Sequence, residues 1–143
     1  MLQLSAKLEY ALLALIELAK HFESRKMTGV KEIAIKQNIP DRYLDQILTE
    51  LKRAGITESL RGARGGHRLS RRSKEITLGD IVKGLEPDKP QTGTVQISPS
   101  QMAIVTLWAE AAKDVELVLH KITLEEFCQV AQNYEQCQIM YYI

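Results

Sequence analysis

Cysteine and long apolar runs are scarce in this chain of 143 residues, and each shortage excludes a class of protein. The two cysteines, Cys128 and Cys137, are too few for the disulfide framework of a small secreted scaffold. The longest apolar runs, such as residues 11–16, are far shorter than the roughly 20 residues that cross a bilayer. The first segment reads as an amphipathic helix and not as a signal peptide, so we expect a cytoplasmic protein.

The overall composition excludes disordered and collagen-like chains, because 45% of the residues are hydrophobic and 26% are charged. At roughly 150 residues per domain, the length fits one domain, or one small domain with an attached arm.

The formal net charge is only +1, but the charge is unevenly distributed. Residues 52–74 contain eight Lys or Arg and one acidic residue, a net charge of +7, whereas residues 75–143 contain four basic and ten acidic residues, a net charge of −6. Residues 1–51 balance at seven of each sign. A basic block inside a neutral protein favours a polyanion as partner. The alternative is a solvated loop.

Apolar residues at helical spacing predict three helices in the first part of the chain. The first covers about residues 5–21. Thr28 is expected to cap a short second helix over residues 30–37, which ends before Pro40 because proline disfavours helical geometry in the preceding residue. The third helix covers residues 41–54.

The rest of the chain is predicted to alternate between short elements and loops. In order, we expect a hairpin over residues 56–70 with a glycine-rich tip, a helix over 78–85, a flexible linker over 86–98, a long helix over 99–121 and a last helix over 124–132 that Thr123 caps; residues 133–143 are left unassigned.

Helix, tight turn, helix and hairpin is the element order of a winged helix-turn-helix, so we expect a mainly α fold with a small β-wing followed by a long dimerisation helix. The third helix buries one apolar face and presents a polar one, where Gln and Arg can pair with base edges in the major groove. Other small helical bundles share this spacing. The polar face consists of Arg42, Asp45, Gln46, Thr49 and Lys52 or Arg53.

The hairpin tip is the most distinctive local motif, because residues 61–69 contain three glycines and three arginines. Glycines permit close approach of the backbone to another surface, and arginines are attracted into a narrow minor groove. A plain glycine turn with solvated arginines is the alternative. The spacing of the phosphate loops of nucleotide-binding enzymes is absent.

Several motifs along nearly the whole chain together carry a family resemblance: Glu9-Tyr10-Ala11-Leu12, Ile39-Pro40, Tyr43-Leu44, Gln46-Ile47, Arg61-Gly62 with Gly65-Gly66, Ile76-Thr77-Leu78 and Trp108. In this combination the chain resembles the Rrf2-type winged helix-turn-helix transcriptional regulators, the family of IscR, NsrR and CymR. The resemblance implies a homodimer that binds a roughly palindromic operator on double-stranded DNA. We expect this regulator to be a repressor.

The resemblance also implies which residues meet the DNA, with the third helix in the major groove and the wing in the adjacent minor groove. The expected DNA-binding residues are Arg42, Tyr43, Asp45, Gln46, Lys52, Arg53, Arg61, Arg64, Gly65, Gly66 and His67. Tyr43 has a second interpretation, with its ring on the core and its hydroxyl on a phosphate. The corresponding domain division is a DNA-binding domain over 1–85, a linker loop over 86–98 and a dimerisation segment over 99–143.

The long helix supports dimerisation independently of the resemblance. Six apolar residues lie 4, 3, 4, 3 and 4 positions apart, which is the 3.5-residue repeat of a coiled-coil seam. The alternative is that the seam packs on the first helix of its own chain. The seam consists of Ile104, Trp108, Ala111, Val115, Val118 and Ile122.

The sequence departs from the cluster-binding members of the family, which carry three closely spaced cysteines in the loop before the long helix. Residues 86–98 contain none, and Cys128 and Cys137 lie later in the chain. Glu9 stands where some relatives place a carboxylate ligand, although a solvated carboxylate is the simpler interpretation. We therefore predict no cofactor, and keep an iron–sulfur or redox-sensing regulator as an alternative.

The remaining motifs do not favour an enzyme. The three histidines show no zinc-ligand spacing, and neither a nucleophile elbow nor a metalloprotease motif occurs. No metal site is predicted. The second alternative is an interaction protein of the same fold, controlled by a regulatory protein partner such as an enzyme.

Overall fold

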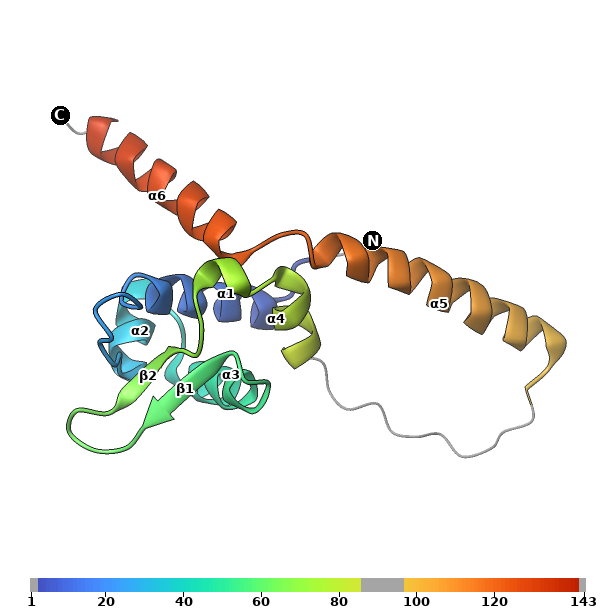
Figure 1. The fold of residues 1–143 in the computed structure, drawn as a ribbon, viewed down its shortest axis with the longest axis horizontal. Coiled ribbons are helices and arrows are strands. Elements are labelled where there is room, and N and C mark those ends of the chain that lie inside the picture. The colour runs from blue at the N-terminus through green and yellow to red at the C-terminus, as the bar shows by residue number, and fades with distance from the viewer. Residues whose placement is uncertain (1–2, 86–96, 142–143) are drawn as a thin grey trace.

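The computed structural model describes residues 3–85 and 97–141 and has the predicted fold, mainly helical with a two-stranded wing (Figure 1). In chain order the elements are α1 (Ala6–Ala19), α2 (Val30–Gln37), α3 (Asp41–Arg53), β1 (Thr57–Leu60), β2 (Gly66–Leu69), the 3-10 turn η1 (Ser73–Glu75), α4 (Leu78–Leu85), α5 (Pro99–Leu119) and α6 (Leu124–Tyr141).

Helix α1 is the centre of the body. It begins at Ser5, whose hydroxyl accepts a hydrogen bond from the N–H of Leu8 at 3.1 Å and so satisfies a free amide of the first turn. Its buried side chains, among them Leu15 and Leu18, contact α2, α3, α4 and α6. These helices surround α1 because each has an apolar face to bury against it.

The turn between α2 and α3 orients the third helix. Helix α2 ends at Asn38, which has a positive φ of 53°, and Ile39 is buried before Pro40 begins the next helix. The carboxylate of Glu17, only 2% exposed, accepts a hydrogen bond from Gln37 at 2.9 Å and so ties α2 to α1. Burial raises the pKa of Glu17, but the hydrogen bond from Gln37 and the charge of Lys20 outweigh it, and the pKa lies below its ordinary value.

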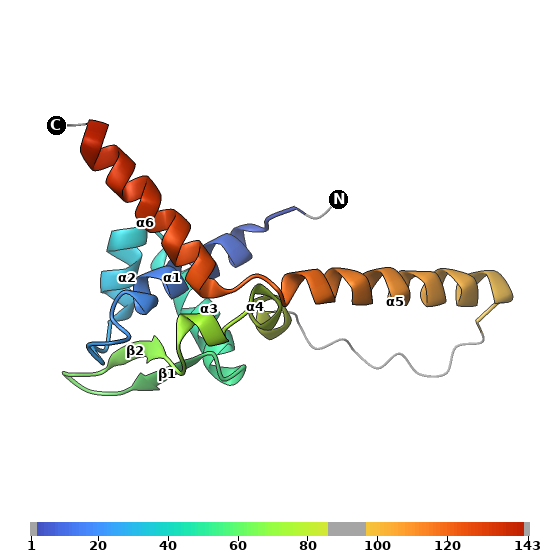
Figure 2. The ribbon, with the colours of Figure 1, turned by 45° about the horizontal axis from the view of Figure 1, so that its top comes forward.

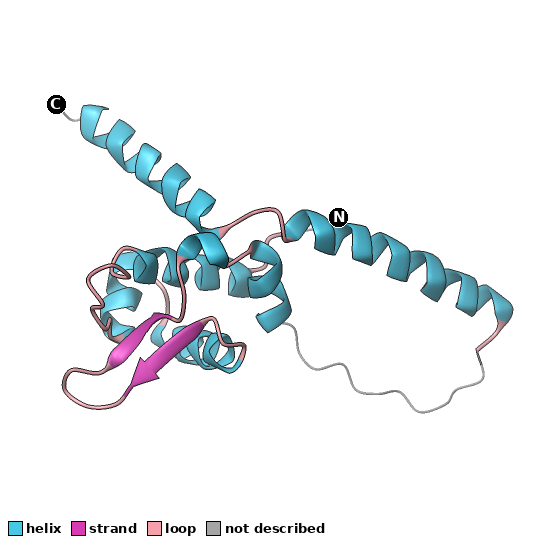
Figure 3. Ribbon diagram, viewed as in Figure 1, coloured by secondary structure: helices cyan, strands magenta, loops and turns pink. Residues whose placement is uncertain are grey.

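The wing is an antiparallel hairpin in which Thr57 pairs with Leu69 and Leu60 with Gly66 (Figure 3). Gly55, with a φ of 79°, makes the turn from α3 into β1. Leu69 is buried, so the base of the hairpin belongs to the core while its tip projects from the body.

Helices α5 and α6 leave the body as two arms that extend in different directions (Figures 1 and 2). Ser98 and Gln101 form a capping box at the start of α5, with Pro99 in its first turn. Thr123 and Glu126 form the predicted capping box of α6 through hydrogen bonds of 3.3 Å and 2.7 Å. Among the helices of residues 3–85 and 97–141, none is both long and apolar enough to cross a membrane.

Three sequence-based expectations about the elements were wrong. Gly29, and not Thr28, is the N-cap residue of α2, because both backbone groups of Thr28 pair with the wing. Helix α5 ends at Leu119, so Ile122 lies beyond it. Helix α6 continues to Tyr141 instead of ending near residue 132, since no glycine or proline interrupts it. Of the predicted linker, residues 86–96 lie outside the described part of the chain.

Candidate nucleic-acid interface

Helix α3 presents the polar face that its sequence predicts. Leu44, Ile47, Leu48 and Leu51 are buried against the core. The opposite side is exposed and consists of Arg42, Tyr43, Asp45, Gln46, Thr49, Lys52 and Arg53. A straight, exposed helix with amide, guanidinium and carboxylate groups on one side has the shape and the donors that a major groove accommodates.

Tyr43 combines features of both of its interpretations. Its side chain is 56% exposed, and its ring lies against that of Tyr10 with the ring centroids 6.2 Å apart and an interplanar angle of 55°. A tilted aromatic pair of this kind fixes the direction of the ring. The phenol hydroxyl is therefore carried at the edge of the α3 face by a contact with α1.

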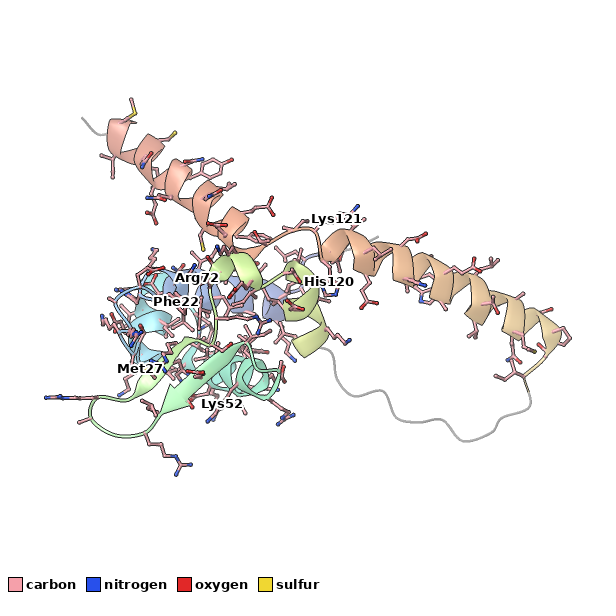
Figure 4. The ribbon with its side chains drawn as sticks, in the orientation of Figure 1. Phe22, Met27, Lys52, Arg72, His120 and Lys121 are labelled. Carbon is pink, nitrogen blue, oxygen red and sulfur yellow. The ribbon has the colours of Figure 1, made fainter. Side chains whose placement is uncertain are left out.

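The wing lies beside α3 on the same side of the molecule, where Figure 4 also shows Lys52. Its position is set by a backbone bridge to the segment before α2. The N–H of His67 donates to the carbonyl of Thr28 at 2.8 Å, and the N–H of Thr28 donates to the carbonyl of His67 at 2.9 Å. The sequence gives no sign of this anchor, because pairing by a single residue leaves no alternating pattern.

Gly65 and Gly66 have steric roles inside the protein. A Cβ at Gly65 would collide with the carbonyl oxygen of Leu60, and one at Gly66 would lie 2.7 Å from the carbonyl carbon and oxygen of Thr28. Gly66 also has a φ of 145°, which residues with a side chain rarely adopt. The surface that these two glycines approach closely is the chain's own backbone.

His67 is half-buried on β2, close enough to Asp45 and Lys52 of α3 to feel their charges. Burial lowers the pKa of its imidazole; the charge of Asp45 acts to raise it, and that of Lys52 acts to lower it. Its Nδ1 is buried without a hydrogen-bond partner among the described residues. The imidazole is therefore neutral near pH 7, and His67 lies on β2 opposite Ser59 instead of at the wing tip.

Two of the eight basic residues of the block are paired within the chain. Arg68 pairs with Glu58 across the hairpin at 3.0 Å, and Arg71 pairs with Asp80 at 3.4 Å. By contrast, Lys52, Arg53, Arg61 and Arg64 are exposed and make no ion pair within residues 3–85 and 97–141. Two of these four cations lie on the α3 face and two at the wing tip, and cations of this kind are the usual partners of phosphate groups.

The seam of α5 faces solvent, so the alternative in which it packs on α1 is not the arrangement in the structure. Trp108 is 75% exposed and Ile104 68% exposed, and Val115 and Val118 are exposed as well. Ile122 instead lies half-buried in the connection to α6. A row of large apolar side chains in water is typical of an interface without its partner.

Of the three residues considered for sensing, Cys128 and Cys137 lie on α6 and Glu9 lies on α1. Cys128 is half-buried on α6, where burial raises the pKa of its thiol, and Cys137 is exposed. Glu9 is exposed on α1. Over the described ranges, no three His, Cys, Asp or Glu side chains come together as metal ligands would.

Comparison with known proteins connects this architecture to one family. The family profile Rrf2, described as an iron-dependent transcriptional regulator, matches residues 4–130. The transcriptional regulator CymR of Bacillus subtilis is 36% identical over 143 residues, which cover 99% of this chain and 100% of the relative.

Solved structures agree with the sequence comparison. The structure of IscR of T. potens has a TM-score of 0.69 and 33% identity, covering 91% of this chain and 88% of that chain. The structure of CymR, the global cysteine regulator of B. subtilis, has a TM-score of 0.67 and 37% identity, covering 91% of this chain and 98% of that chain.

Proposed function

This chain belongs to the Rrf2 family of transcriptional regulators, and from that premise we propose that it is a homodimer that represses transcription by binding a roughly palindromic operator. Its relatives are DNA-binding regulators and not enzymes, and so is this protein. The proposal adds the dimer, the symmetry of the operator and the direction of regulation. It also places the protein in the cytoplasm.

The observation that carries the proposal is the alignment of the exposed α3 face with a basic wing. Gln46 and Arg42 on α3 supply groups that can hydrogen-bond to base edges. Arg61 and Arg64 supply cations at the tip of the wing. In the proposed complex α3 enters the major groove and the wing tip the neighbouring minor groove. Gly65, Gly66 and His67 serve this complex by holding the wing in place.

The exposed seam of α5 supports the proposed dimer. A coiled-coil repeat that projects into water is stabilised when a second copy covers it, and two copies related by a two-fold axis present two α3 helices to a palindromic site. In this proposal residues 1–85 bind DNA, residues 99–143 form the dimer, and residues 86–98 link these two parts.

Selection of bound DNA from a random pool, with anaerobically prepared protein, tests the proposal directly. We expect an enriched motif with two-fold symmetry, bound with an affinity that falls steeply with salt because phosphate contacts release counterions. A pool without a shared motif, or binding that ignores salt, would contradict it and favour the partner-controlled interaction protein.

We predict that Gln46→Ala relaxes base discrimination at one position of each half-site. A paired amide contact discriminates between bases by roughly 1–3 kcal/mol, whereas non-specific binding depends on phosphate charge. Lys52→Ala is the matched control on the same exposed face and should weaken all sequences alike. The measurement is titration of single-base operator variants at fixed salt. If Gln46→Ala weakens binding to all operator variants equally and keeps the base preferences, Gln46 does not contribute to base discrimination.

We predict that Arg61→Ala and Arg64→Ala each weaken operator binding and flatten its salt dependence. Each lost phosphate contact reduces the slope of log K against log salt by about 0.9, hence by about two per dimer. Arg68→Ala is the control, because Arg68 is already paired with Glu58. Slopes measured over a salt series decide the question, and unchanged slopes in both variants would refute a wing contact with phosphates.

A further inference from the structure

A chain of polar contacts runs from the end of α3 into α4. Its first member is Arg71, which follows β2. The Nη1 of Arg71 donates to the carbonyl of Gly55, just after α3, at 3.2 Å, and its Nη2 donates to Oδ2 of Asp80 on α4 at 3.4 Å. Its Nε donates to the carbonyl of Glu75 at 3.2 Å. One guanidinium therefore connects α3, η1 and α4.

Asp80 is held in place by the first turn of its own helix. Its Oδ2 accepts a hydrogen bond from the N–H of Thr77 at 3.0 Å, and its own N–H donates to the hydroxyl of Thr77 at 3.1 Å. Burial raises the pKa of Asp80, but the hydrogen bonds from Thr77 and the charge of Arg71 bring it below its ordinary value. The carboxylate is therefore ionised near pH 7 and pairs with Arg71.

His120 carries the chain of contacts from α4 to α5. It is the C-cap residue of α5, and Figure 4 shows it where this helix meets α4. Its Nδ1 lies 2.9 Å from the hydroxyl oxygen of Thr77 and 3.8 Å from Oδ1 of Asp80, and its Nε2 lies 3.7 Å from a carboxylate oxygen of Glu116 on α5.

The imidazole of His120 fits against a glycine of α4. A Cβ at Gly79 would lie 2.6 Å from Cγ and Nδ1 of the ring, so only glycine allows this contact. The backbone holds the same junction, since the N–H of Leu78 donates to the carbonyl of Ile122 at 2.8 Å. Because α5 meets the body at α4, this junction determines its direction relative to α3.

We propose that Arg71, Asp80 and His120 form a strut that fixes the angle between α3 and α5, and thereby the spacing between half-sites that the dimer recognises. The inference rests on the proposed dimeric function. None of the three residues touches DNA in this proposal, so they are positioning residues. A change in this angle alters the separation of the two α3 helices, which must match one helical turn of DNA, roughly 34 Å.

The test is a series of operators in which the two half-sites are moved one or two base pairs closer together or further apart. For the wild-type protein we expect a loss of about tenfold for one base pair, because each base pair also rotates the half-site around the duplex. For His120→Ala we expect the same shift of one base pair to lower the affinity by less than about threefold. Its dimer mass and its affinity for a single half-site should be unchanged. Lys121→Ala, an exposed neighbour, is the matched control.

Two further variants separate the strut from a general loss of stability. His120→Asn keeps an amide near the hydroxyl of Thr77 and should restore most of the spacing preference. Arg71→Ala should broaden the preference as His120→Ala does, with exposed Arg72→Ala as its control. Because both residues act through Asp80, the double variant should be no broader than either single variant.

The outcomes are distinguishable. Retention of the wild-type spacing preference by His120→Ala and Arg71→Ala, with intact dimers, would overturn the strut alone. If the wild-type protein binds no operator, or binds as a monomer, the proposed function fails and the strut fails with it. Should His120→Ala not fold, the comparison of His120→Asn with Arg71→Ala decides, and equal, wild-type preferences in both would overturn the strut.

Discussion

Trp108→Asp is expected to produce a monomer whose operator affinity is about 100-fold lower, since the gain from linking two binding sites is of that order. In the isolated chain the indole is 75% exposed, so the substitution leaves the core of the protomer untouched. In the proposed dimer the same position is covered by a second copy. A carboxylate there would lose its water without a partner, which opposes association strongly.

The matched control for Trp108→Asp is Thr106→Asp. Thr106 is also exposed on α5, and two positions along a helix of 3.6 residues per turn place it on nearly the opposite side. Thr106→Asp introduces the same charge outside the seam, so this variant should remain a dimer. Light scattering with operator titration measures both effects. A dimer of full strength in Trp108→Asp would show that the seam is assigned wrongly.

Gly66→Ala is expected to detach the wing, with a loss of roughly 1–3 kcal/mol in the free energy of unfolding from strained backbone alone. A Cβ at Gly66 would lie 2.7 Å from the carbonyl group of Thr28, so the bridge that anchors His67 must open. Arginines on an unanchored wing lose their alignment with α3. Operator affinity should therefore fall by about tenfold or more, the equivalent of 1.4 kcal/mol.

Gly62→Ala separates the clash from the strain. Gly62 also has a positive φ, 109°, but a Cβ there would meet nothing within 4 Å. Thermal unfolding, operator titration and amide exchange at Thr28 and His67 should be measured for both variants. We expect faster exchange at these amides only in Gly66→Ala. Weak operator binding with normal exchange would mean instead that Gly66 acts by direct contact with DNA.

Local sequence signals predicted most elements correctly because their chemistry is local. Ser5 and Thr123 mark helix starts through hydrogen bonds to residues three positions away, and Gly55 marks the end of α3. The helical spacing of the apolar positions in α3 predicted which of its sides is buried. The prediction failed at Thr28, whose role depends on a residue 39 positions later in the chain.

The sequence by itself determined the winged helix-turn-helix, the family and the composition of the polar α3 face, because helical periodicity and turn chemistry are properties of neighbouring residues. Only the tertiary structure decided which basic residues are left unpaired and can bind a partner. Arg68 and Arg71 are paired within the chain, whereas Arg61 and Arg64 are not paired within its described part. It also decided that Gly66 and His67 anchor the wing and that His120 meets Gly79. Such contacts join distant residues, and no local pattern encodes a distance across the fold.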